Sequence, residues 1–154
     1  MKRRTLLRAA ITTAQLSLLI GAGTILPRRL LAQWPADAFH AEKLGDAERL
    51  LFGERPIEDS DLVTIEAPDI AENGRNVPVE IRVALPAADS VSLFSDKNPF
   101  PLLARARFTP EVAPRLALRV KLGDSGKLIA VVEADGKLYR ATRPVKVTAG
   151  GCGG

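Results

Sequence analysis

The chain contains a single cysteine, and this residue is the one best suited to covalent chemistry. Cys152 is the third residue from the C-terminal end, in the sequence Gly150-Gly151-Cys152-Gly153-Gly154. Glycine has no Cβ and adopts backbone conformations closed to other residues, so the four neighbours predict a flexible arm with little around the sulfur. The thiolate is the nucleophilic form, and an exposed cysteine with a pKa of about 8.5 is ionised to a small extent near neutral pH. No cationic residue adjoins Cys152, so activation must come from another protein. The pattern favours a covalent carrier or attachment site over a catalytic nucleophile.

The other residue types form no catalytic or metal-binding pattern. His40 is the only histidine, and with no cysteine, aspartate or second histidine placed beside it we expect it to be exposed to solvent. No glycine-rich loop joins a strand to a helix, as a phosphate-binding loop requires. The single cysteine also excludes an intramolecular disulfide. We therefore expect no catalytic residues, no metal and no cofactor.

The positive net charge of +4 belongs to the first part of the chain. Residues 1–32 contain six basic residues and no acidic ones, which leaves 16 basic and 18 acidic residues and a net charge of −2 in the remainder. This distribution gives no indication of a nucleic-acid surface. The basic residues that alternate in two later segments are expected on the solvated faces of strands; they are Arg105, Arg107, Arg119 and Lys121.

Residues 1–32 have the pattern of an export signal. Arg3-Arg4 is followed by Thr5-Leu6-Leu7, close to a twin-arginine motif, and residues 9–26 form a moderately apolar core that stops at Pro27. Cleavage is expected after residue 32, with an alternative end at residue 38. A retained membrane anchor is the competing reading, but the core is short and contains glycines. We expect a periplasmic protein, exported by the twin-arginine route and without a membrane anchor after cleavage.

Residues 33–148 predict one all-β domain preceded by a helix. Apolar residues at helical spacing predict a short amphipathic helix over residues 39–52, which Gly53 would end. After it, apolar and polar residues alternate in short segments separated by turn residues, and Asp135-Gly136 is a typical two-residue hairpin turn. The predicted strands cover residues 62–67, 77–85, 91–95, 104–108, 116–122, 128–134 and 137–147. This regular spacing predicts an immunoglobulin-like antiparallel β-sandwich, and residues 149–154 would form the arm that carries Cys152.

Several motifs, together with the tail, resemble the SoxY family. The tail Gly150-Gly151-Cys152-Gly153-Gly154 is the most specific of them, and the twin-arginine leader agrees with it. The internal motifs that resemble the family are Glu72-Asn73-Gly74 with Val77-Pro78-Val79, Asn98-Pro99-Phe100-Pro101, Arg119-Val120-Lys121 and the hairpin Asp135-Gly136-Lys137-Leu138-Tyr139. Members of this family are sulfur-carrying subunits of the SoxYZ complex in periplasmic thiosulfate oxidation.

The resemblance implies a carrier cycle on Cys152. Thiosulfate would be coupled to the thiol by the cytochrome complex SoxAX, and the hydrolase SoxB would release the terminal sulfone as sulfate. SoxCD, where present, would oxidise the remaining sulfane, and SoxB would then act again. SoxZ, a small β-sandwich protein, would form a heterodimer with the chain. The protein itself would be a carrier and not an enzyme, with covalent sulfur adducts in place of a cofactor.

Two other functions remain open on the residues alone. The chain could be an immunoglobulin-like periplasmic interaction module that uses Cys152 for an interchain disulfide. It could also be a thiol-dependent redox enzyme, although it has no second cysteine and no base placed beside the first. A stable disulfide-linked dimer as the sole working form would favour the interaction module.

Overall fold

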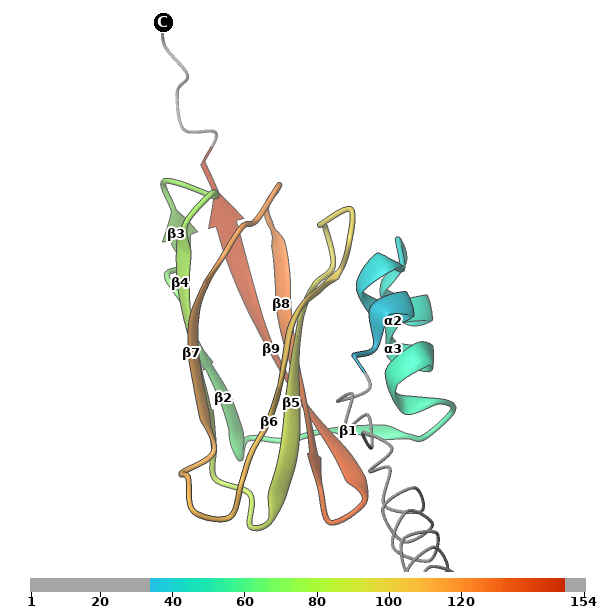
Figure 1. Ribbon diagram of the computed structural model, residues 1–154. Helices are drawn as coiled ribbons and strands as arrows, with labels where there is room; N and C mark the ends of the chain where they lie inside the picture. The colour runs from blue at the N-terminus through green and yellow to red at the C-terminus, as the bar shows by residue number, and fades with distance from the viewer. Residues whose placement is uncertain (1–33, 149–154) are drawn as a thin grey trace, which may run out of the picture. The chain divides into compact units, whose positions relative to one another are not determined.

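In the computed structural model, which describes residues 34–148, the segments with alternating apolar and polar residues form two β-sheets (Figure 1). The chain divides into two units, and the second, which begins at Pro35, contains every helix and strand described. Its elements are α2 (Ala36–His40), α3 (Leu44–Phe52), β1 (Ile57–Asp59), β2 (Val63–Glu66), β3 (Ile70–Ala71), β4 (Val77–Val83), β5 (Ala88–Ser95), β6 (Leu102–Arg107), β7 (Arg115–Val120), β8 (Gly126–Ala134) and β9 (Lys137–Val147). The predicted all-β, immunoglobulin-like sandwich is confirmed.

The larger sheet has the strand order β1-β9-β8-β5-β6, and β3 pairs with the far part of β9. The smaller sheet has the order β2-β4-β7. All neighbours are antiparallel except β1 and β3, which run parallel to β9. These two strands were absent from the prediction because they have three and two residues, too few for an alternating pattern to be visible.

The main core fills the space between the sheets. In β4, Val77, Val79, Ile81 and Val83 are buried, while the residues between them face outward. They meet the inward-facing residues of β5 and β8, such as Leu93 and Ala130, in one cluster. The alternation in the sequence therefore records which face of each strand is buried.

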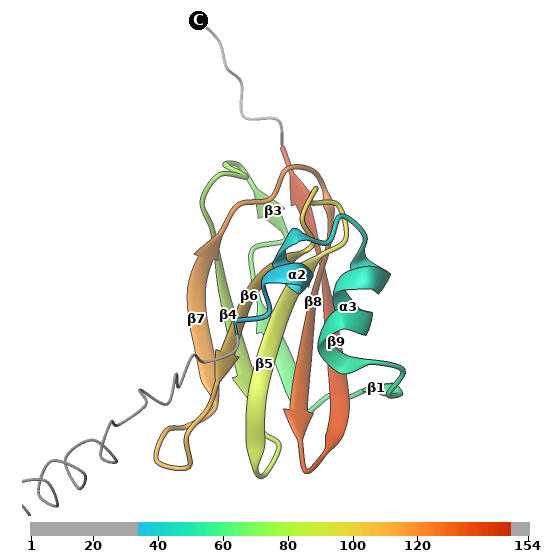
Figure 2. The ribbon, with the colours of Figure 1, turned by 45° about the vertical axis from the view of Figure 1, so that its right-hand side comes forward.

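A second apolar layer covers the outer face of the larger sheet. Figure 2 shows α2 and α3 lying across these strands. Phe52 of α3 packs edge-to-face on Phe94 of β5 with ring centroids 6.3 Å apart, and Ile129 and Val131 of β8 belong to the same cluster. Because β8 is covered on both faces, its residues 128–132 are all buried, which explains their unbroken apolar run.

The prediction of one helix over residues 39–52 is wrong in detail. The chain forms two helices, because Ala41 and Lys43 have extended backbone angles that separate α2 from α3. The break lets Ala38 and Ala47 both reach the apolar layer, whereas Leu50, one of the apolar residues whose helical spacing led to the prediction, is 56% exposed. The expected stop at Gly53 is confirmed: its φ is 67°, and its N–H donates to the Arg49 carbonyl at 2.8 Å. No helix in the described part of the chain is long and apolar enough to cross a membrane.

Candidate functional site at the tail end of the sandwich

The strand that leads to the C-terminal residues ends among the loops at one end of the sandwich. We call this the tail end; it comprises segment 67–76, loops 96–101 and 121–125, and the last residues of β9 (Figure 1). The last described residue is Thr148. Cys152, Gly150, Gly151, Gly153 and Gly154 lie outside the described residues, as do Arg3 and Arg4 of the predicted signal. The structure therefore describes the surroundings of the tail as far as Thr148.

The end of β9 is held on both sides. On one side, β3 pairs with it in the register Ala71 to Val147, and the Thr148 N–H donates to the Ala71 carbonyl at 3.1 Å. On the other side, the Ser125 hydroxyl accepts a hydrogen bond from the Val147 N–H at 2.9 Å and donates one to the Val147 carbonyl at 3.2 Å. One side chain thus bonds both backbone polar groups of the last strand residue, which fixes the direction in which the chain leaves the sandwich.

Gly74 lies where two backbone segments approach each other closely. Its carbonyl accepts a hydrogen bond from the Leu122 N–H at 2.7 Å. A Cβ at this position would stand 2.5 Å from the Leu122 carbonyl oxygen and 2.8 Å from Cγ1 of Val147. The absence of a side chain is what lets segment 67–76 reach loop 121–125 and the end of β9 together.

Loop 96–101 is tied to its neighbours by its own side chains. The Asn98 amide group donates to the Lys121 carbonyl at 2.8 Å, and its oxygen accepts from the Gly123 N–H at 3.0 Å. The Asp96 carboxylate accepts from the Lys127 N–H at 2.7 Å. Loop 96–101 is therefore held by bonds to neighbouring segments as well as by the restricted φ angles of its two prolines.

Three lysines line a groove beside the last residues of β9. The groove is lined by Lys97, Lys127 and Lys146, with Asp69 and Asp96, and also by Pro144 and Val145. Asp69 is paired with Arg143 at 2.8 Å, and Asp96 already accepts a backbone hydrogen bond. Among residues 34–148, no carboxylate lies within ion-pair distance of these three lysines.

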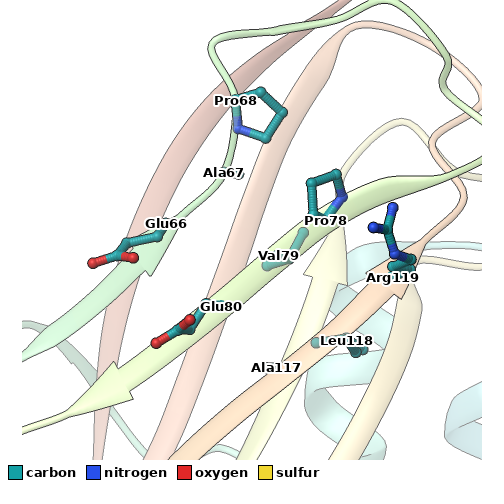
Figure 3. Close-up of a pocket in the computed structure, with 9 residues that line it drawn as sticks. All are labelled: Glu66, Ala67, Pro68, Pro78, Val79, Glu80, Ala117, Leu118 and Arg119. Carbon is teal, nitrogen blue, oxygen red and sulfur yellow. The ribbon is translucent and has the colours of Figure 1, made fainter.

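A second hollow lies on the outer face of the smaller sheet and is shown in Figure 3. Pro68 and Pro78 stand in its middle, with the carboxylates of Glu66 and Glu80 on one side and Arg119 at the other. Hydrogen bonds from Arg82 and Arg115 lower the pKa of the Glu80 carboxyl. These ion pairs give the Glu80 carboxylate structural partners, and no Ser, Thr, Cys, Lys or His lines the hollow.

The other side chains considered in the sequence can be placed one by one. His40 is exposed at the end of α2. In the described part of the chain, no group of three His, Cys, Asp or Glu residues could hold a metal ion. Arg107, Arg119 and Lys121 are exposed. Arg105 differs, because it is half-buried with its guanidinium 5.9 Å from the centre of the Phe52 ring, and burial lowers its pKa.

Sequence reasoning did not identify the residues that hold the start of the tail. Asn98 and Gly74 were noticed only within motifs, and Ser125 was not noticed at all. Their hydrogen bonds join residues that are more than 20 positions apart, so no local sequence pattern predicts these bonds.

Comparison with known proteins gives the same family for sequence and fold. Residues 48–152 match the family model "Sulfur oxidation protein SoxY". The structure of the sulfur carrier protein SoxY from Chlorobium limicola f thiosulfatophilum is 43% identical, with a TM-score of 0.64, and the match covers 69% of this chain and 96% of that one. A superoxide reductase (neelaredoxin) from Ignicoccus hospitalis T24K shares the fold at 21% identity, with a TM-score of 0.54 over 60% of this chain and 94% of that one. No curated protein matches the chain. With most of the sandwich and the cysteine-bearing tail inside the family match, the chain belongs to the SoxY family of sulfur oxidation proteins.

Proposed function

We propose that this sulfur carrier holds thiosulfate-derived intermediates covalently on Cys152 and presents them to the enzymes of the Sox system. The observation that carries the proposal is the extent of the family match, which ends at residue 152, the only cysteine in the chain. Cys152 follows Thr148 by four residues, so an extended chain brings it at most about 14 Å from the described end of the sandwich. That distance is sufficient to enter the active-site cleft of another protein.

The chemistry of loading requires a partner. Joining the Cys152 sulfur to the sulfane sulfur of thiosulfate forms an S–S bond, releases the thiol proton and removes two electrons. SoxAX, a cytochrome complex, would accept the electrons. Hydrolysis by SoxB would then cleave the terminal sulfone as sulfate and leave a persulfide on Cys152. SoxCD, where present, would oxidise that sulfur before a second hydrolysis. In this cycle the chain needs no cofactor and no catalytic residue of its own.

The carrier would act as a heterodimer with SoxZ in the periplasm. The leader with Arg3 and Arg4 supports export by the twin-arginine route, which carries folded proteins, so that SoxZ could cross the membrane with its partner. Replacing both arginines by lysine should keep the protein in the cytoplasmic fraction. Periplasmic recovery of that variant in undiminished amount would contradict the proposed route.

The test of the carrier role is the substitution Cys152→Ser. In a reconstituted system with thiosulfate, this variant should lose all carrier-dependent turnover while its unfolding curve stays that of the parent. Intact-mass analysis of the parent protein should show sulfur-containing adducts confined to the C-terminal peptide. Undiminished turnover by the serine variant would overturn the proposal.

The same material tests the alternative of an interchain disulfide. If the chain is a carrier, the preparation that supports turnover should run on a non-reducing gel as a species without a disulfide-linked partner. An activity found only in a disulfide-linked dimer would favour the interaction module instead.

A further inference from the structure

The length of the tail limits where a partner enzyme can touch the sandwich. If Cys152 is the attachment site, as proposed above, its Cα cannot lie more than about 14 Å from that of Thr148, and the sulfur extends beyond this only by the short cysteine side chain. An enzyme that encloses this sulfur in a cleft must therefore bring the rim of that cleft against the tail end. The side chains exposed there are the ones available for recognition.

Phe100 has the properties of an interface anchor. Its side chain is 52% exposed at the tail end, although burial of an aromatic ring is normally favourable. It stands between Pro99 and Pro101, in the loop that Asn98 ties to Lys121 and Gly123. The Pro101 carbonyl also accepts a hydrogen bond from the Ser95 N–H at 2.9 Å. An exposed ring on a backbone held in this way can be bound without the entropy cost of ordering the loop.

The lysine groove includes Lys97 of this loop and Lys146, the residue before the last one of β9. Lys97 is two residues before Pro99, and Ser125, which lines the groove, is the residue that bonds Val147. The ammonium groups of Lys97, Lys127 and Lys146 have no carboxylate at ion-pair distance among residues 34–148. A surface carrying carboxylates would complement them and would be steered toward the tail end.

We propose that Phe100 and the groove lysines Lys97, Lys127 and Lys146 form a docking surface for the partner enzymes that act on Cys152. The matching enzyme surface has an apolar pocket for the Phe100 ring and carboxylates at the rim of its active-site cleft. Docking holds the sandwich while the tail delivers the sulfur. This inference rests on the carrier function, but it assigns recognition to residues of the sandwich and not to the tail.

The test compares substitutions at the two ends of the sandwich in the complete chain with its Sox partners. Phe100→Ala should raise the KM of the enzymes for the carrier about tenfold or more, as loss of an aromatic anchor does, and leave the maximal rate unchanged. Its control is Val112→Ala, which removes a 59%-exposed apolar side chain from the loop between β6 and β7, at the other end. That control should leave KM unchanged.

The charge component has its own matched pair. Lys127→Glu should raise KM severalfold at low ionic strength, and the effect should shrink as salt is added, because salt screens exposed charges. Lys137→Glu makes the same charge change at the other end of the β8–β9 hairpin and should have little effect. The rate at which a small maleimide labels Cys152 should be the same in all four variants, which confirms that the thiol itself is unchanged.

The outcomes separate this inference from the carrier function. If Phe100→Ala and Lys127→Glu leave KM unchanged while Cys152→Ser is inactive, the carrier function stands and the docking surface is overturned. If Cys152→Ser retains turnover, both fall. If Phe100→Ala instead separates the chain from SoxZ on size-exclusion chromatography, the surface is a subunit interface, and its assignment to the enzymes is overturned.

Discussion

The two ends of the sandwich are built in different ways. At the tail end, side chains from Asn98, Ser125 and Asp96 bond to backbone groups more than 20 residues away. The other end, which we call the hairpin end, comprises loops 84–87 and 108–114 and the turn at 135–136. There the chain reverses mainly through local geometry: Asp135 and Gly136 have φ angles of 49° and 72°, and the Val112 N–H bonds to the Thr109 carbonyl at 3.0 Å.

The difference indicates where the molecule requires a fixed position. A local turn only has to join two strands, and its residues can satisfy their own backbone groups. Long-range bonds from side chains add rigidity between segments that could otherwise move independently. In this chain, the bonds of Ser125 hold the last strand residue before the tail, and those of Asn98 and Asp96 hold loop 96–101 at the same end. A carrier benefits from this arrangement, because a stable origin makes the reach of the tail reproducible.

The largest effect is expected from Gly74→Val at the tail end. The new side chain would collide with the Leu122 carbonyl and with Val147, so segment 67–76 must move away from both. We expect a loss of about 3 kcal/mol or more in the free energy of unfolding, measured by urea denaturation. Hydrogen exchange should show lost protection at the Leu122 amide, which in the parent protein donates a hydrogen bond to the Gly74 carbonyl.

The matched control for Gly74→Val is Gly136→Ala at the hairpin end. No atom lies within 4 Å of a Cβ at Gly136, so the cost arises from its positive φ alone and should be about 1 kcal/mol. An equal loss in the two variants would show that close approach at Gly74 is not what distinguishes the tail end.

An intermediate effect is expected from Asn98→Ala. This change removes the hydrogen bonds to Lys121 and Gly123 and should lower the free energy of unfolding by about 2 kcal/mol. Because the loop then holds Phe100 less firmly, the KM of partner enzymes for the carrier should also rise. The control is Asn76→Ala, an exposed asparagine at the same end whose side chain makes none of these bonds. A normal KM in Asn98→Ala would mean that loop rigidity does not contribute to docking.

The smallest effect is expected from Glu80→Gln, on the outer face of β4 between the two ends. Hydrogen bonds from Arg82 and Arg115 place the pKa of Glu80 below its ordinary value of 4.5 in the folded protein. The carboxylate therefore contributes stability above pH 4.5, and that contribution is lost as the pH falls through the lowered pKa. The glutamine variant should show a shallower decline of the unfolding temperature in this acid range.

A matched change for Glu80→Gln is Glu111→Gln, because Glu111 is exposed and has no ion pair among residues 34–148. It should leave the acid decline as it is in the parent. Turnover with Sox partners should be the same in both glutamine variants. A rise in KM for Glu80→Gln would extend the docking surface beyond the tail end.

Much of the fold could be predicted because the residues of the longer strands alternate according to which face is buried. The alternation from Val77 to Val83 and the hairpin residues Asp135 and Gly136 are local signals, and both are confirmed. The apolar run at residues 128–132 was correctly read as a strand, but the reason for it is the helix layer on its second face. Such a run cannot indicate by itself what covers it.

The helices show the limit of local reading. Leu50 has the right spacing for an apolar helix face, yet it is exposed, because the break at residues 41–43 turns α3 so that Ala47 and Phe52 meet the sheet. Strands β1 and β3 are likewise defined by their partner β9 and not by their own residues. The orientation of α3 and the pairing of β1 and β3 depend on residues that are distant in the chain.

The sequence by itself determined which reactive residues this protein has and how its strands are patterned: one thiol among glycines, one histidine in a distant segment, and alternation that requires a two-sheet core. These are properties of residue type and order, and they need no knowledge of contacts. Only the tertiary structure decided how the start of the tail is held and which side chains surround it. Strand pairing and loop contacts across the domain bring together four residues at this end, namely Gly74, Asn98, Ser125 and Val147. Phe100, two residues after Asn98, is left exposed. Contacts between residues so far apart follow from the packing of the sheets, which no short stretch of residues encodes.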